Sequence, residues 1–255
     1  MRCVIRHVLL SIAAVAVLCV ATDGAVLAQI QPADPESSFK RDYPAVTFET
    51  IEKTGIEGLY EVFAGGNLFY YHPKTGNLLF GEMITREFRN ITAERRNERI
   101  AAVLKALPLD KAIRIGTGKN VVIEFTDVDC PFCRKIEDLF DKREDVTRYV
   151  FLFPLTQIHP ESIKKSLAVL CSQDRAKAYR DAAAGRFDGK DMPGCGDDAA
   201  RLLDEHREFG RRLGIQGTPA LWVNATPVEG ANAVQIERLL DTGNEAYSLR
   251  KEVKP

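Results

Sequence analysis

The alternation of apolar and polar positions along the chain predicts three kinds of segment. An apolar run from Val8 to Val20, interrupted only by Ser11, lies near the N-terminus. Short apolar runs bounded by Gly, Pro and Asn follow between residues 58 and 80, and they predict the strands of a small β-rich unit. From residue 112 onwards apolar runs alternate with stretches of helical periodicity, which is typical of an α/β domain.

The N-terminal run has the features of a signal peptide. Arg2 and Arg6 precede it, and the small-residue segment Val26–Ala28 offers a cleavage site. A helix needs about 20 apolar residues to span a membrane, and this run is shorter; a retained signal anchor is the alternative. We expect residues 1–28 to be removed, which leaves 33 basic and 35 acidic side chains. Such a balance gives no electrostatic footprint for nucleic acid, so we expect no nucleic-acid partner.

Residues 39–88 are predicted to form a small β-rich domain, after a polar leader over residues 29–38. Its strands are expected at Gly58–Phe63, Asn67–Tyr71 and Leu78–Phe80. Because a unit of this size buries little apolar surface, we expect it to be a dimerisation domain; packing on the larger domain of its own chain is the alternative. Residues 89–111 follow as a linker, built on a charged helix over Thr92–Leu107; packing of this helix on the second domain is the alternative.

The larger domain, residues 112–255, carries strands and helices in alternation. Strands are expected at Val121–Phe125, Tyr149–Phe153 and Ala220–Val223, and helices at Arg134–Phe140, Glu161–Tyr179, Asp198–Leu213 and Ala233–Leu240. The second helix is expected to bend near Cys171. The order strand, helix, strand, helical insert, strand, helix predicts an α/β domain with a mixed sheet.

The segment Cys130-Pro131-Phe132-Cys133 lies where the first of these strands meets the first helix. A helix N-terminus presents free N–H groups and the positive end of the helix dipole, and both stabilise a thiolate, the reactive form of cysteine. We therefore expect Cys130 to attack and Cys133, one turn inside the helix, to resolve. A structural disulfide and half of a zinc site are the alternatives.

Four cysteines remain after residue 28, an even number that points to disulfides in an exported protein. Three pairings are possible, and Cys130–Cys133 with Cys171–Cys195 is favoured because it gives one local redox pair and one separate staple. A staple of this size contributes about 3 kcal/mol in the chain-entropy model. A four-cysteine zinc site usually needs a second close pair, so we expect no metal and no other cofactor.

Two positions outside the C-x-x-C segment are candidates for the same chemistry. Glu124 stands within the apolar strand that delivers Cys130, so a buried carboxylate there can take the proton of Cys133 as a general base. An exposed acid at the strand end is the alternative. Thr218-Pro219 follows a glycine and opens a strand, which favours a cis peptide bond packed against the cysteines. That arrangement leaves a strand edge free for an extended substrate, whereas an ordinary trans turn would not.

Several segments in order resemble the family of periplasmic disulfide isomerases DsbC and DsbG. They are Gly58–Val62, Phe125–Asp127 before the C-x-x-C, the Cys171/Cys195 pair and Gly217–Ala220. The resemblance implies a thioredoxin fold with a helical insert, a homodimer and a cleft that holds misfolded exported proteins. It also implies that Cys130 attacks wrong disulfides, that Cys133 resolves the mixed disulfide and that Thr218 with cis Pro219 contacts the client. A membrane reductase of the DsbD type is the implied electron donor.

The chain departs from that family pattern at three places. The dipeptide Pro131-Phe132, which we expect to contact clients, is nearer the Pro-Tyr of DsbG than the Gly-Tyr of typical DsbC. Asp129 places a negative charge beside Cys130, which opposes thiolate formation. Glu124 resembles the buried acid of the oxidase DsbA. We predict a periplasmic isomerase or reductase with chaperone activity; a DsbA-like oxidase and a client-holding chaperone or assembly factor are the alternatives.

Overall fold

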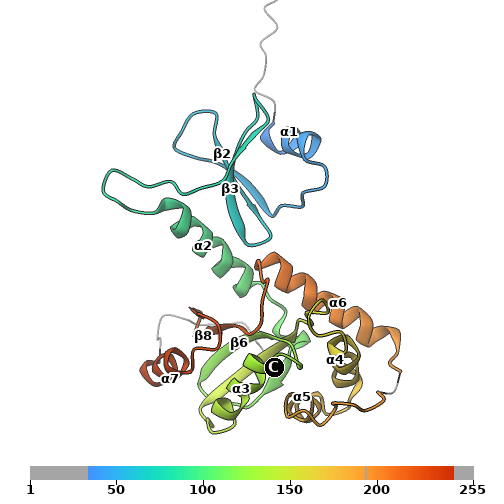
Figure 1. The fold of residues 1–255 in the computed structure, drawn as a ribbon. Helices are drawn as coiled ribbons and strands as arrows, with labels where there is room; N and C mark the ends of the chain where they lie inside the picture. The colour runs from blue at the N-terminus through green and yellow to red at the C-terminus, as the bar shows by residue number, and fades with distance from the viewer. Residues whose placement is uncertain (1–33, 193, 244–255) are drawn as a thin grey trace, which may run out of the picture. The chain divides into compact units, whose positions relative to one another are not determined.

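The structure is a computed structural model that describes residues 34–192 and 194–243. The predicted signal peptide and its cleavage site lie outside the described residues. Among the helices that are described, none is both long and apolar enough to cross a membrane. The described chain contains two β-sheets, one in the N-terminal part and one in the C-terminal part (Figure 1).

The N-terminal part consists of an antiparallel sheet and one helix. In chain order the elements are α1 (Pro35–Asp42), β1 (Thr50–Lys53), β2 (Tyr60–Ala64), β3 (Asn67–His72) and β4 (Asn77–Leu79). The four strands lie in sequence order, each antiparallel to the next. Gly65 and Gly66 form the turn between β2 and β3, and both have a positive φ. A two-residue hairpin turn requires that conformation, which favours glycine.

Helix α1 and strand β1 were not predicted. The first residues of α1 fall within the polar leader expected over residues 29–38, so that prediction is wrong for them. The helix begins there because the Asp34 carboxylate accepts a hydrogen bond from the backbone N–H of Ser37 at 3.0 Å. The helix stays in place because Phe39 is fully buried, with its ring 5.1 Å from that of Tyr71 on β3.

The C-terminal part is built on a mixed five-stranded sheet. Helix α2 (Ile91–Lys105) and a 3-10 turn at Leu109–Lys111 precede it. Its strands are β5 (Ile113–Ile115), β6 (Asn120–Thr126), β7 (Val146–Leu152), β8 (Ala220–Val223) and β9 (Thr226–Val228), in the spatial order β5-β7-β6-β8-β9. Strands β6 and β7 are parallel and the other neighbours are antiparallel, which confirms the predicted mixed sheet.

Five helices accompany this sheet: α3 (Pro131–Phe140), α4 (Ser162–Cys171), α5 (Arg175–Ala183), α6 (Asp197–Arg212) and α7 (Ala233–Thr242). The helix predicted over residues 161–179 is interrupted, so it forms α4 and α5. Ser172 is extended, and the Asp174 side chain caps α5 by accepting from the backbone N–H of Lys177 at 2.9 Å. The chain therefore turns just after Cys171, close to the predicted bend.

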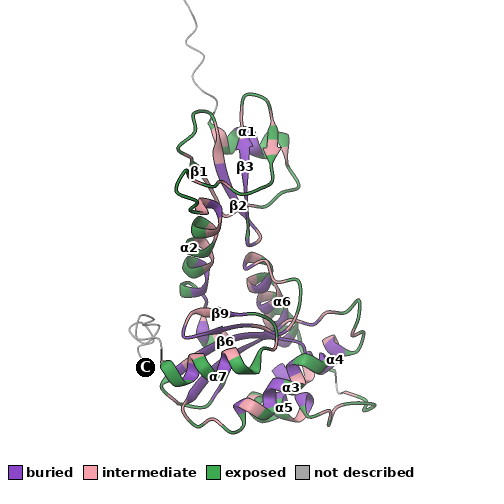
Figure 2. Ribbon diagram, turned by 60° about the vertical axis from the view of Figure 1, so that its left-hand side comes forward, coloured by how far each residue is buried: buried purple, intermediate pink, exposed green. Residues whose placement is uncertain are grey.

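Strand β6 is the central strand and is buried along most of its length (Figure 2). Its alternate side chains serve two different cores, because successive residues of a strand point to opposite faces. Val122 packs with residues of α3 and α7, whereas Phe125 packs with residues of α6. The β6-α3-β7 unit, the β8-β9 hairpin with α7 and the inserted helices α4 to α6 together make a thioredoxin fold with a helical insert, as predicted.

Candidate active site

The two thiols lie where strand β6 ends and helix α3 begins. Cys130 is the N-cap residue and Pro131 occupies the first turn, where a missing N–H leaves no intrahelical hydrogen bond unmade. Cys133 follows in the same turn. Cys130 exposes 4 % of its surface and Cys133 exposes 2 %. The central strand and the helix cap therefore bring both cysteines to one buried position at the sheet's end.

The two thiols differ in their affinity for a proton. A hydrogen bond from the Cys133 thiol lowers the pKa of Cys130 to about 5, against the opposing effect of burial. The backbone N–H groups of Cys133 and Phe132 act in the same direction. Burial, together with the hydrogen bond to Cys130, raises the pKa of Cys133 well above its ordinary value. At neutral pH the Cys130 side chain is therefore a thiolate, while Cys133 keeps its proton.

The loop before β8 lies against the sulfur atom of Cys130. The distance from Cys130 Sγ to the backbone carbonyl oxygen of Thr218 is 3.3 Å, and the Thr218 side chain also lowers the pKa of Cys130. The peptide bond between Thr218 and Pro219 is cis, as the sequence predicted. Pro131 and Phe132 are exposed on the helix side, with 62 % of Phe132 open to solvent. The four residues expected to contact a client thus border the redox pair.

Asp127 fixes the turn that carries the chain from β6 to Cys130. Its side chain is fully buried, and its carboxylate accepts hydrogen bonds from the backbone N–H groups of Asp129 at 2.9 Å and Leu155 at 2.7 Å. The same carboxylate lies 2.9 Å from His159 Nδ1. Three contacts from two segments hold the turn in one conformation, so Asp127 acts as a structural anchor for the site.

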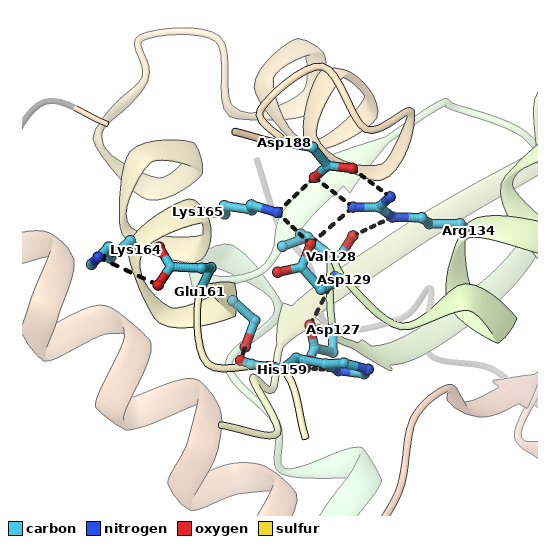
Figure 3. A network of polar contacts seen from close by, with 10 residues as sticks. Asp127, Val128, Asp129, Arg134, His159, Glu161, Lys164, Lys165 and Asp188 are labelled. Carbon is cyan, nitrogen blue, oxygen red and sulfur yellow. Dashed lines mark hydrogen bonds and ion pairs between the residues drawn. The ribbon is translucent and has the colours of Figure 1, made fainter. Parts of the chain in front are cut away.

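The negative charge of Asp129 is compensated by a ring of ion pairs, shown in Figure 3. The Asp129 carboxylate lies 2.9 Å from Arg134 of α3 and 2.6 Å from Lys165 of α4. Asp188 completes the ring, at 2.8 Å from Arg134 and 2.6 Å from Lys165. Two cations balance two carboxylates, so the ring as a whole does not oppose the Cys130 thiolate as Asp129 alone would.

Glu124 is fully buried on β6, as expected, but it is not an isolated acid. Its carboxylate pairs with Arg148 of β7 at 2.9 Å, and Arg148 also pairs with Glu137 of α3. The hydroxyl of Tyr179 on α5 donates to Glu137 at 2.6 Å and lies 3.4 Å from Glu124. Burial raises the pKa of Glu124, while the positive charge of Arg148 opposes that rise. None of the three partners was predicted from the sequence.

Cys171 and Cys195 form a disulfide between the end of α4 and the segment that leads into α6. This is the pairing that the sequence favoured. Cys130 and Cys133 are free thiols. The disulfide closes a loop that contains Asp188, so the staple restrains the segment that supplies one corner of the ion-pair ring beside Cys130.

Fold and site together define a class: a thioredoxin-fold thiol:disulfide oxidoreductase whose attacking thiol caps a helix. Residues 107–242 match a thioredoxin-like domain, and residues 26–93 match the disulfide bond isomerase protein N-terminal domain. The chain is 31 % identical to the probable thiol:disulfide interchange protein DsbC of Bordetella avium over 202 residues, which is 76 % of this chain and 70 % of that protein. It is 26 % identical to DsbC of Escherichia coli K12 over 210 residues, 76 % of this chain and 85 % of that protein.

Among solved structures, a disulfide interchange protein from Neisseria gonorrhoeae is 32 % identical and aligns with a TM-score of 0.43, covering 53 % of this chain and 97 % of that one. The chain belongs to the DsbC family of periplasmic disulfide isomerases. It is a thiol:disulfide interchange enzyme, which confirms the predicted activity over the oxidase alternative. The match to the isomerase N-terminal domain supports a homodimer.

Proposed function

We propose that this chain is exported, loses its signal peptide near Ala28 and rearranges non-native disulfides of exported proteins in the periplasm. The observation that carries the proposal is the placement of two free thiols: Cys130 caps α3 beside the cis Thr218–Pro219 bond, and Cys133 is buried in the same helical turn. The lowered pKa of Cys130 and the raised pKa of Cys133 agree with this placement. One sulfur is ready to attack at neutral pH, and the other is ready to release the product once its proton leaves. Residues 112–255 form the catalytic domain in this proposal.

The reaction has two exchange steps. The Cys130 thiolate attacks a client disulfide, forms a mixed disulfide and displaces one client sulfur as a thiolate. When that client sulfur attacks a different disulfide of its own chain, it frees another client thiolate. When this thiolate attacks the client sulfur of the mixed disulfide, a new client disulfide forms and Cys130 is released unchanged as a thiolate. When the client stalls, Cys133 loses its proton and attacks Cys130, which forms the Cys130–Cys133 disulfide and reduces the client. Glu124 is the proposed acceptor of the Cys133 proton.

The client is expected to bind along the loop that carries Thr218 and Pro219. Strand β8, which begins just after this loop, is paired on both sides with β6 and β9, so an extended peptide would add its backbone hydrogen bonds to the loop itself. The exposed ring of Phe132, beside Pro131, offers an apolar contact on the other side of the thiols. Because backbone contacts read no particular sequence, this arrangement suits an enzyme that handles many different misfolded clients.

The small domain, residues 39–88 together with α1, is the proposed dimerisation domain, and residues 89–111 are its linker to the catalytic domain. Strand β4 is an edge strand of the small sheet. The segment from β4 onwards exposes large apolar side chains: Leu79 by 49 %, Phe80 by 77 %, Ile84 by 49 % and Phe88 by 90 %. An apolar segment beside an open strand edge is suited to cover by a second copy.

Continued isomerase activity needs Cys130 to stay reduced, since only the thiolate attacks. We propose that a membrane reductase of the DsbD type supplies the electrons by exchange with the Cys130–Cys133 disulfide. Chaperone activity would reside in the apolar surfaces rather than in the thiols. It should therefore survive alanine at both Cys130 and Cys133 in an aggregation-suppression assay.

The proposed function is tested by reactivation of scrambled ribonuclease in a glutathione buffer. Wild type should restore ribonuclease activity, and Cys130→Ala should not. Cys133→Ala should retain isomerisation by the first route but should accumulate stalled mixed disulfide. If wild type fails to reactivate the scrambled enzyme while it still oxidises a reduced dithiol peptide, the protein acts as an oxidase and the proposal is wrong.

A further inference from the structure

Four buried side chains form a polar cluster between strand β6 and helix α3. Glu124 exposes none of its surface and Tyr179 exposes 1 %, while Arg148 exposes 3 % and Glu137 exposes 7 %. The two carboxylates share one guanidinium, and the Tyr179 hydroxyl lies between them. The two-step exchange described above uses only Glu124, so the structure leaves three buried polar residues without a role.

The cluster holds one fewer positive charge than it has acidic groups. If both Glu124 and Glu137 were ionised, Arg148 would leave one buried negative charge uncompensated, which is costly away from water. Burial accordingly raises the pKa of Glu124. The cluster is therefore suited to hold one extra proton and to release it. The Arg148 proton is not the one that moves, because the two carboxylates outweigh burial and keep the pKa of Arg148 well above its usual range.

The cluster borders the resolving thiol. Cys133 lies four residues before Glu137 on α3, so the two buried residues share one face of the helix. The charge of Glu124 also raises the pKa of Cys133. The Thr126 hydroxyl lies beside both of them: it lowers the pKa of Glu124 and that of Cys133. This buried hydroxyl has no well-formed hydrogen bond in the described part of the chain. Glu124 lies two residues before Thr126 on the same face of β6, so it is the proposed acceptor of the proton that leaves Cys133.

The hydroxyl of Tyr179 connects the two carboxyl groups of the cluster. Tyr179 donates to Glu137 Oε1 at 2.6 Å and lies 3.4 Å from Glu124 Oε1, so one hydroxyl bridges the two carboxyl groups. Glu137 is less deeply buried than Glu124. Of the two acids, only Glu137 keeps part of its surface in contact with solvent, so it is the one that can exchange its proton with water.

We propose that Tyr179 relays the proton of Cys133 from Glu124 to Glu137 during the resolving step, a proposal that rests on the proposed roles of Cys130 and Cys133. The Cys133 S–H bond breaks and Glu124 takes the proton. Glu124 passes a proton to the Tyr179 oxygen as the Tyr179 O–H proton moves to Glu137, so the tyrosine ends neutral. The Cys133 thiolate then bonds to the Cys130 sulfur, and the client sulfur leaves with the electron pair of the broken disulfide.

Arg148 is a positioning residue in this relay. It hydrogen-bonds to Glu124 and to Glu137, so each carboxyl group keeps a partner whichever of them carries the proton. The guanidinium thus fixes the two acids on either side of the tyrosine hydroxyl. The relay separates the two exchange steps: attack by the Cys130 thiolate needs no proton transfer, whereas attack by Cys133 does.

The test is a rapid-quench single turnover with reduced protein and a disulfide-bonded peptide, comparing wild type with Tyr179→Phe. Acid quench and mass spectrometry measure the formation of the mixed disulfide and its decay to the Cys130–Cys133 disulfide. We expect Tyr179→Phe to form the mixed disulfide at the wild-type rate and to resolve it about tenfold more slowly, since one positioned proton carrier is lost. The slowing of resolution in deuterium oxide should also be smaller than in wild type.

Tyr71→Phe is the matched control, because Tyr71 is also fully buried and donates its hydroxyl to a carboxylate, that of Asp42. It should resolve at the wild-type rate. Glu137→Gln keeps the shape of the acceptor but cannot take the proton, so it should show the Tyr179→Phe defect. The relay is overturned if Tyr179→Phe resolves as fast as wild type, or if it slows formation and resolution equally. Failure of wild type to form any mixed disulfide at Cys130 would instead overturn the proposed function.

Discussion

Replacement of Cys133 by alanine examines why the attacking thiol is ionised. The Cys133 thiol is the largest contributor to the low pKa of Cys130, which is about 5. A hydrogen bond to a charged group contributes about 1.5–3 kcal/mol, and one pKa unit corresponds to about 1.4 kcal/mol. Removing this donor should therefore raise the pKa of Cys130 by roughly one to two units in Cys133→Ala.

The ultraviolet absorbance of the thiolate, followed through a pH titration, measures this change, and the pH dependence of alkylation gives an independent value. Cys130→Ala is the control: it keeps only the buried Cys133 thiol and should show no thiolate transition below neutral pH. The explanation is refuted if Cys133→Ala titrates at the wild-type midpoint. It is equally refuted if wild type titrates near the ordinary value for a thiol.

Four other features of the structure can be tested by measurements of stability, thiol titration and association. The pKa of the attacking thiol is lower in the folded chain than the ordinary value of 9.0. The free energy of unfolding of reduced protein, relative to that of oxidised protein, should therefore rise by about 2–3 kcal/mol from pH 5 to pH 7, and this gain should be lost as pH falls back to about 5. Urea unfolding curves of reduced protein that are the same at pH 5 and pH 7 would contradict this. Lys165→Met should raise that pKa by roughly half to one unit, because it removes a cation from the ring beside the thiol, while Lys164→Met, whose ion pair is exposed, should not. Alanine at both Cys171 and Cys195 should lower the free energy of unfolding in urea by about 3 kcal/mol. An unchanged midpoint would show that this disulfide does not stabilise the folded chain. Phe88→Ser should weaken the dimer at least about tenfold by analytical ultracentrifugation, and an unchanged dissociation constant would place this side chain outside the dimer interface.

The local chemistry of the site was readable from the sequence because its determinants are local. The apolar strand and the junction at which the C-x-x-C segment meets the next helix lie within a few residues of each other, and the structure has both as predicted. Helix α1 was missed for the opposite reason. Its sequence is polar apart from Phe39, and only the aromatic partners of that residue, from elsewhere in the small domain, make the segment a stable helix.

The balance of charges around the thiols could not be predicted in full, because some of the compensating partners lie far along the chain. From sequence alone Asp129 opposes the thiolate, yet Lys165 lies 36 residues away and joins Arg134 in neutralising it. Glu124 was expected to be buried, and it is, but Tyr179 is 55 residues distant and no local pattern links the two. Arg148 within the apolar strand β7 was the sign in the sequence, because a buried arginine needs an acid on a neighbouring element to compensate its charge.

We propose that Cys130 is the sulfur that bonds to clients, and trapping the mixed disulfide is the decisive experiment. Cys133→Ala protein would be incubated with a disulfide-bonded client, quenched with acid and mapped by mass spectrometry. We predict one adduct, through Cys130, and none in the Cys130→Ala protein. An adduct through Cys171 or Cys195, or no adduct at all, would contradict the account.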